Sequence, residues 1–374
     1  MPALEPLPAV RVEAVELVTV PMRLSTPLRT AAGLRDQRDV LLVHVRAAEA
    51  EGWAECVAEP EPTYSPEFTA AAAIVLHDHL IPRAWAGPMG DGLALGAHLD
   101  AVRGHPMARA ALELATLDAQ LRAADRSLAG WLGATARSVA PGAALGLHAR
   151  PDALLAEADE ALAAGAVRLR VKVAPRHAAD HLLALRAHVG PDVILQADAN
   201  GSFTEGDPEL DRLDEAGLAC LEQPLAPDDL LGHARLAERL VTPICLDEPL
   251  TSLGAIEAAI ALGACEVVCL KPARVGGWIA ALAVHDRCAE LGVPIWVGGM
   301  LETGIGRAAN LAVAALPHVA LPPDMDPRGR FASDLSDELL PVDGVVAIPD
   351  GPGTGAAPHP GRLGDADIVE VLRP

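Results

Sequence analysis

The chain has 374 residues, a formal net charge of −22 and 51% hydrophobic residues, while aromatic residues make up only 2%. This length predicts one large domain or two moderate ones, with a core built from Ala, Leu and Val. The acidic balance argues against nucleic acid and anionic membrane surfaces as partners, since both require basic patches.

The first part of the chain predicts strands followed by helices. Residues 10–24 and 40–57 alternate apolar and polar side chains, as antiparallel strands do, and residues 66–82 and 105–127 have helical spacing. Strands grouped before helices are typical of an α+β arrangement. We therefore predict a separate α+β domain over residues 1–135.

The middle of the chain predicts alternating strands and helices. After about residue 140, short apolar runs rich in β-branched residues are separated by segments rich in Ala and Leu with helical spacing. This alternation predicts βαβ units and a parallel sheet over residues 136–335. The Gly- and Pro-rich stretch at 339–361 is too irregular for another unit, so we expect residues 336–374 to return to the first domain.

Polar residues end the apolar runs at an even spacing. They recur about every 25 residues, which is the length of one strand, one helix and two loops; they are Lys172, Asp198, Glu222, Asp247 and Lys271. This repeat predicts a (β/α) barrel whose active site lies at the carboxyl ends of its strands. A doubly wound open sheet is the competing fold, but it would gather ligand groups at one switch point.

Three of these residues predict a metal site. Asp198, Glu222 and Asp247 would end three consecutive strands, and carboxylate oxygens are ligands that suit Mg²⁺. Acids gathered at one edge would repel one another without a cation. We therefore predict Mg²⁺ as the cofactor, with Mn²⁺ able to substitute.

The two lysines predict acid–base chemistry. Lys172 precedes the acidic trio and Lys271 follows it, so in a barrel they lie on opposite sides of the metal. Arg170 shares the inward face with Lys172 because side chains alternate along a strand. We expect burial, together with the nearby charge of Arg274, to lower the pKa of Lys271 so that it can act as a base. The predicted substrate is a small carboxylate, whose α-proton one lysine removes to form an enediolate.

Seven stretches in this order carry a resemblance to a known family. They are RTAAG at 29–33, RLRVKV at 168–173, QADANGSFT at 196–204, EQPL at 222–225, PICLDEPL at 243–250, LKPARVGG at 270–277 and VGGMLETGIGRAAN at 297–310. With them the chain resembles the muconate-lactonizing subgroup of the enolase superfamily, and within it the o-succinylbenzoate synthases and N-succinylamino acid racemases. The resemblance implies a modified (β/α)8 TIM-like barrel, an α/β fold, beneath an α+β capping domain.

The resemblance also implies roles for individual residues. Lys172 and Lys271 would be the two acid/base residues. Asp198, Glu222 and Asp247 would bind Mg²⁺. Asn200, Glu248, Arg170 and Arg274 would support these groups, and the backbone at Gly298, Gly299 and Met300 would approach the substrate. The implied activity is dehydration by an o-succinylbenzoate synthase of menaquinone biosynthesis, with N-succinylamino acid racemisation alongside.

Two departures from the family pattern leave the substrate open. Arg170 replaces the usual first lysine of the K-x-K element and cannot act as a base. Asp324 and Asp326 resemble the paired acids that hold a substrate ammonium group in dipeptide epimerases. A dipeptide epimerase or another cycloisomerase-like enzyme is therefore the alternative, and a non-catalytic metal-binding scaffold is the alternative of another class.

The cellular compartment and the oligomeric state are also predicted from the sequence. The six cysteines form no C-x-x-C pair and several lie in apolar runs, which favours reduced, buried thiols in the cytoplasm. The opening stretch lacks the features of a signal peptide, and no window of about 20 residues is apolar enough to span a bilayer. We expect a homo-oligomer.

Overall fold

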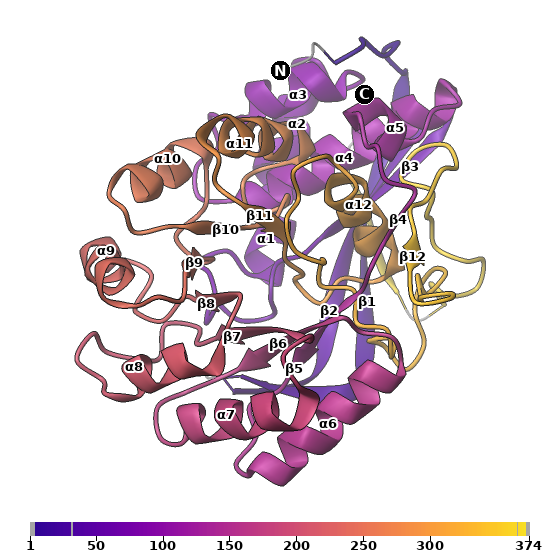
Figure 1. Ribbon diagram of the computed structural model, residues 1–374. Coiled ribbons are helices and arrows are strands. Elements are labelled where there is room, and N and C mark those ends of the chain that lie inside the picture. The colour runs from indigo at the N-terminus through magenta and orange to yellow at the C-terminus, as the bar shows by residue number, and fades with distance from the viewer. Residues whose placement is uncertain (1–3, 31–32, 365, 372–374) are drawn as a thin grey trace.

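The computed structural model describes residues 4–30, 33–364 and 366–371. Ala31 and Ala32, the centre of the RTAAG stretch, lie outside the described residues, as do 1–3, 365 and 372–374 at or near the chain ends. The described chain forms a parallel barrel and an antiparallel sheet with its own helices (Figure 1). The predicted fold class is confirmed, whereas the boundaries at 135/136 and 335/336 stay predictions.

The antiparallel sheet has four strands in the order β13-β1-β2-β3. These strands are β1 (Val12–Thr30), β2 (Gly33–Ala47), β3 (Glu51–Cys56) and β13 (Asp367–Val371). The chain therefore contributes one strand from its last described residues to the sheet formed by its first ones. Alternate residues of β1 and the central residues of β2 are buried, as the sequence pattern predicts for a sheet packed on a core.

Helices of the first part cover one side of this sheet. They are α1 (Thr69–Val75), the π-helix η1 (Leu76–Leu80), α2 (Ile81–Trp85), α3 (Gly92–Leu99), α4 (Pro106–Ala123) and α5 (Leu128–Leu132). Helix α4 starts with a proline at its first position, where no backbone hydrogen bond is lost. Nearly all of its side chains are buried, because it lies against both the sheet and the barrel.

The barrel consists of seven parallel strands that neighbour one another in sequence order. They are β5 (Gly142–Leu145), β6 (Arg168–Lys172), β7 (Ile194–Asp198), β8 (Cys220–Glu222), β9 (Ile244–Leu246), β10 (Val267–Leu270) and β11 (Ile295–Val297). A segment at 319–325 occupies the eighth position. It bridges Ile295 at Val319 and Gly142 at Asp324, and thus closes the sheet between β11 and β5.

The barrel helices follow their strands along the outer side of the sheet, from magenta to orange in Figure 1. They are α6 (Pro151–Ala163), α7 (Ala178–Val189), α8 (Glu209–Leu213) with the short 3₁₀ turn η2 (Asp214–Ala216), α9 (Leu230–Arg239), α10 (Leu253–Ala261), α11 (Trp278–Leu291) and α12 (Gly304–Ala314). Three begin at capping side chains that accept a backbone hydrogen bond, namely Asp229, Ser252 and Thr303. A two-stranded pair, β4 (Ser138–Val139) with β12 (Val346–Ala347), lies outside the barrel sheet.

Two carboxylates of the first part dock it onto the barrel. Glu113 of α4 accepts from the amide of Trp278 at the start of α11, at 2.8 Å. Glu55 of β3 accepts from the amide and hydroxyl of Thr303 at the start of α12, at 2.9 and 2.7 Å. Both carboxylates accept hydrogen bonds from backbone amides at the start of a helix, which have no partner within the helix. Among the described helices, none combines the length and apolar character that crossing a membrane requires.

Candidate active site

The predicted strand ends meet at one end of the barrel. Lys172 of β6 lies opposite Asp198 of β7, which lies opposite Glu222 of β8. Asp247 and Lys271 directly follow β9 and β10. All five side chains are buried. The even spacing in the sequence therefore corresponds to neighbouring positions in space.

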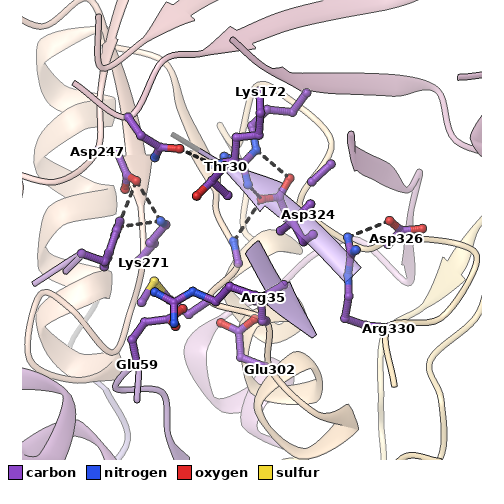
Figure 2. A pocket seen from close by; sticks show the side chains of 18 of the residues that line it. Thr30, Arg35, Glu59, Lys172, Asp247, Lys271, Glu302, Asp324, Asp326 and Arg330 are labelled. Carbon is purple, nitrogen blue, oxygen red and sulfur yellow. Dashed lines mark hydrogen bonds and ion pairs between the residues drawn. The ribbon is translucent and has the colours of Figure 1, made fainter. Parts of the chain in front are cut away.

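A cavity of about 250 Å³ opens among these residues. Lys172, Lys271 and Asp247 line it, and Figure 2 shows Lys271 with Asp247 on one side and Lys172 nearer Asp324 on the other. The first part of the chain covers it with Leu28, Thr30, Arg35, Glu59, Thr63 and Tyr64. A cavity between two structural units is where small ligands commonly bind.

Among the described residues, those that hold Lys172 by hydrogen bonds belong to the barrel. Its Nζ donates to Asp198 Oδ2 at 2.6 Å and to Asn200 Oδ1 at 2.8 Å. Asn200 in turn donates from Nδ2 to Glu248 Oε1 at 3.1 Å. Asn200 and Glu248 therefore lie beside this lysine and line the cavity with it.

Lys271 is held by Asp247 and by a tyrosine. Its Nζ lies 2.8 Å from Asp247 Oδ2 and 2.8 Å from Tyr64 Oη. Arg274 pairs with the other Asp247 oxygen at 2.6 Å and also donates to Tyr64. One carboxylate thus receives two cations.

The predicted lowering of the Lys271 pKa is wrong for this arrangement. Burial does disfavour the ammonium, and Arg274 repels it, but Asp247 is the strongest of several groups that favour the charged form, and together they hold the pKa of Lys271 well above its ordinary value. Asp247 stays ionised for the complementary reason. Burial opposes its charge, while Arg274 and Lys271 hold the pKa of Asp247 well below its usual range.

Tyr64 is a site residue that the sequence reasoning missed. It is the only tyrosine of the chain and lies in the loop between β3 and α1. Its hydroxyl donates to Asp247 Oδ2 at 2.9 Å, while it accepts from Lys271 and Arg274. Burial raises the pKa of Tyr64 well above its ordinary value, so the hydroxyl remains protonated. The loop has no periodic pattern, and the rarity of tyrosine was the one available signal.

Arg170 does more than add a cation beside Lys172. Its Nη1 contacts Asp198 and lies 3.5 Å from both oxygens of Glu222. The guanidinium therefore balances part of the charge of two predicted metal ligands. A lysine at this position would offer a single ammonium in place of a planar fork of donors.

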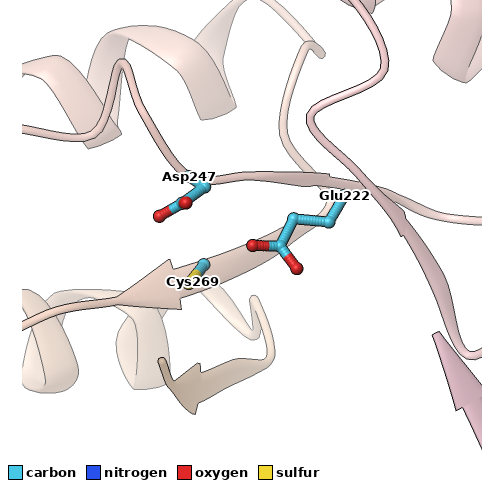
Figure 3. A group of neighbouring side chains, drawn as sticks. All are labelled: Glu222, Asp247 and Cys269. Carbon is cyan, nitrogen blue, oxygen red and sulfur yellow. The ribbon is translucent and has the colours of Figure 1, made fainter. Parts of the chain in front are cut away.

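The donor set at the strand ends fits a divalent cation. Ligand atoms of Glu222, Asp247 and Cys269 lie within 4.8 Å of one another (Figure 3). Burial, together with the charges of Asp198 and Asp247, raises the pKa of Glu222 to about 8. Clustered, buried acids of this kind are stabilised by a bound cation. Asp198 is not part of the 4.8 Å cluster because its Oδ2 is held by Arg170 and Lys172.

The predicted backbone segment after β11 divides into two parts. Gly299 and Met300 line the cavity. Gly298 is not among the residues that line it, and its approach to the substrate stays a prediction. A Cβ at Gly298 would lie 2.6 Å from Cys269 Sγ and 3.0 Å from the Lys271 side chain. The absence of a side chain at Gly298 therefore leaves room for Cys269 and, to a lesser degree, for Lys271.

Asp324 lines the cavity but is already paired. It lies 2.5 Å from nitrogen atoms of both Arg168 and Arg170. Burial opposes its charge, but these arginines hold the pKa of Asp324 below its usual range. The two guanidinium groups also lie over the ring of Trp296, at 4.4 and 5.5 Å from its centroid.

Asp326 is paired as well. Its oxygen atoms accept from Arg328 and Arg330, with 2.7 Å contacts to each. Asp324 and Asp326 therefore do not form the pair of free carboxylates that a substrate ammonium group would need.

The chain matches family models over both of its parts. Residues 12–133 match the N-terminal domain of mandelate racemase and muconate lactonizing enzyme, and residues 153–362 match the enolase C-terminal domain-like model. An N-succinylamino acid racemase of Amycolatopsis is 43% identical, with 96% of this chain and 99% of that protein covered. An o-succinylbenzoate synthase of Geobacillus kaustophilus is 37% identical, with 93% of each chain covered. A solved enolase superfamily member from Listeria innocua superposes with a TM-score of 0.92 at 31% identity, covering 97% of this chain and 99% of that one.

Proposed function

The chain belongs to the mandelate racemase and muconate lactonizing enzyme family of the enolase superfamily, and from that premise we propose that it is an o-succinylbenzoate synthase that also racemises N-succinylamino acids. The N-succinylamino acid racemase of Amycolatopsis is 43% identical to it and the o-succinylbenzoate synthase of Geobacillus kaustophilus 37% identical, in both cases over nearly the whole chain. The observation that carries the proposal is the pair of lysines, each held by a strand-end carboxylate, that line one cavity.

The two lysines divide the proton transfers between them. The lysine on one side removes the α-proton of the substrate, and the lysine on the other side faces the opposite face of the same carbon. In dehydration Lys172 takes the proton and Lys271 stays cationic, which stabilises the negative charge that develops on the substrate. In racemisation the second lysine returns a proton. The high pKa that Asp247 gives Lys271 suits the cationic role.

A divalent cation, Mg²⁺ in this proposal with Mn²⁺ able to substitute, would be held by Asp198, Glu222 and Asp247. When bound it would supply a Lewis acid for the carboxylate of the substrate. Asn200 and Glu248 orient Lys172 through their hydrogen bonds. Arg170 and Arg274 balance the charge of the acids from either side.

The alternatives are less well supported. A dipeptide epimerase needs acids that are free to hold an ammonium group, but Asp324 and Asp326 pair with arginines. A scaffold without activity would not need two buried lysines. We also propose that the protein is cytoplasmic, acts in menaquinone biosynthesis and forms a homo-oligomer, as the family resemblance implies. The six buried, unpaired thiols are in keeping with the cytoplasm.

Two assays test the proposal. Dehydration of the o-succinylbenzoate synthase substrate is followed by absorbance, and α-proton exchange of N-succinylamino acids in deuterium oxide is followed by NMR. We expect both reactions to require the divalent cation. Exchange in dipeptides without either of these reactions would replace the proposal with the epimerase.

A further inference from the structure

One buried cation of the cavity wall has no anionic partner. Arg307 of α12 is only 4% exposed and lines the cavity. Its Nη2 donates to the carbonyl of Asp326 at 3.2 Å, and its Nη1 has no hydrogen-bond partner. No ion pair within 4.0 Å joins it to a carboxylate among the described residues. A buried charge left unpaired is costly, so this position calls for an anion.

The other arginines on this wall are paired with acids. Arg35 pairs with Glu59 at 2.9 Å, and Arg330 pairs with Asp326 at 2.7 Å. Glu302 accepts from an amide side chain, that of Asn310, at 2.9 Å. Arg307 is thus the cation of this wall whose charge is not balanced by a direct contact.

Charges of both signs surround Arg307. Burial lowers the pKa of Arg307 and Arg330 lowers it further, while Asp326, Asp334 and Glu302 raise it from beyond ion-pair distance. The charge of Arg307 is therefore opposed by acids at a distance but is not neutralised by a direct contact with one of them.

We propose that Arg307 binds the second carboxylate of the substrate, at the end of its succinyl chain. The inference rests on the proposed function, since that function supplies substrates with two carboxylates. One carboxylate is taken up at the acidic strand ends, so the other must lie elsewhere in the cavity. A guanidinium with a free nitrogen offers a carboxylate a charge-assisted hydrogen bond, often in paired geometry.

Binding of two matched ligands tests the subsite. N-succinylglycine and N-succinamoylglycine have nearly the same shape and differ in charge only at the far end. Calorimetry with the Mg²⁺-loaded protein is performed on wild type, Arg307→Met and Arg307→Lys. Arg307→Met should weaken binding of N-succinylglycine by about 10- to 100-fold, as the loss of a hydrogen bond to a charged group does, and leave binding of the amide within about twofold. Arg307→Lys should restore part of the preference for the acid.

The controls separate a binding role from a structural one. Arg287→Met removes a surface arginine that pairs with Glu257 and Glu290, and it should change neither affinity. Equal losses for both ligands, or no loss for either, would overturn the subsite. If circular dichroism shows that Arg307→Met is unfolded, Arg307→Gln takes its place with the same expectation.

The proposed function can fail separately from this inference. Absence of α-proton exchange and of dehydration in the wild type would reject the function. The affinity difference between the two glycine ligands would still report whether Arg307 holds a carboxylate, because binding is measured without turnover.

Discussion

The two lysines of the cavity are held in different ways. Lys172 contacts Asp198 and Asn200, which lie on the next strand of the barrel and in the loop after it. Lys271 contacts Asp247 of the barrel and Tyr64, which comes from the loop of the first part of the chain. Within the described parts of the chain, the hydrogen bonds that hold Lys172 therefore come from the barrel repeat. The Lys271 side is complete only when the first part is docked.

This difference separates two kinds of functional residue. The barrel side needs consecutive strands in the right register, which a repeating sequence encodes. The other side also needs a contact between segments 207 residues apart in the chain. Variants on the two sides should consequently differ in which proton transfer they impair and in how strongly they depend on docking.

Asp247→Asn should have the largest effect. It removes the negative charge that holds Lys271 and Arg274, and it also removes one of the proposed metal ligands. Breaking a buried ion pair costs about 3–5 kcal/mol of stability. We expect the free energy of unfolding to fall by that order, Mg²⁺ binding to weaken, and kcat/KM to fall by about 10³-fold or more.

Denaturant unfolding, calorimetry and α-proton exchange measure these three quantities. Glu257→Gln, a half-exposed acid that pairs with Arg287 on the surface, is the control and should be neutral. Full activity of Asp247→Asn in buffer treated with chelator would show that the Lys271 side does not depend on this carboxylate.

The two lysine variants test the two sides of the site separately. Each of Lys172→Ala and Lys271→Ala should reduce racemisation by about 10²- to 10⁴-fold, the usual contribution of a general acid–base group. Each should retain α-proton exchange from one enantiomer, and the two variants should retain opposite ones. NMR exchange of each pure enantiomer decides this. Exchange of the same enantiomer by both variants would mean that the lysines do not face each other across the substrate.

Much of the barrel side could be predicted from the sequence. A parallel strand must end before its helix begins, so evenly spaced polar residues at strand ends become neighbours in space. That reasoning correctly brought Lys172, Asp198 and Glu222 side by side. It also reached the fold class, because strands before helices and strands alternating with helices give different sheets.

The other side could not be predicted in the same way. Tyr64 lies in an irregular loop, where neither period 2 nor period 3.6 indicates which way a side chain points. The pKa of Lys271 was predicted in the wrong direction because the ion pair with Asp247 was not considered beside burial and Arg274. Both findings concern contacts between side chains, which spacing along the chain does not encode.

Paired variants of intermediate effect sharpen the comparison. Tyr64→Phe removes a hydroxyl that contacts Lys271, and Asn200→Ala removes an amide that contacts Lys172. Losing a hydrogen bond to a charged group should slow the exchange that depends on the lysine concerned by about tenfold. The exchange that depends on the other lysine should change by less than about threefold in each variant. Loss of both exchanges to the same degree in either variant would remove the distinction between the two sides.

The last prediction concerns docking and its pH dependence. Burial raises the pKa of Glu113 from 4.5 to about 7, although the amides of Ile279 and Trp278 favour its ionised form. The folded state therefore keeps this proton to a higher pH than the unfolded state does. The stability that it contributes is fully present below pH 4.5 and is lost as the pH rises to about 7, by up to about 3 kcal/mol.

Glu113→Gln removes this titration while an amide oxygen can still accept from Trp278. The variant and the wild type should be nearly equal in denaturant stability at pH 5, and the variant should be more stable at pH 8. Trp278 starts the helix that follows the Lys271 loop, so hydrogen exchange at the start of α11 should slow in the variant at pH 8. Exchange at the start of α7, which follows Lys172, should stay unchanged, because the barrel side needs no docking. An equal change at both helices would mean that Glu113 stabilises the whole molecule, and that the Lys271 side has no special dependence on the first part of the chain.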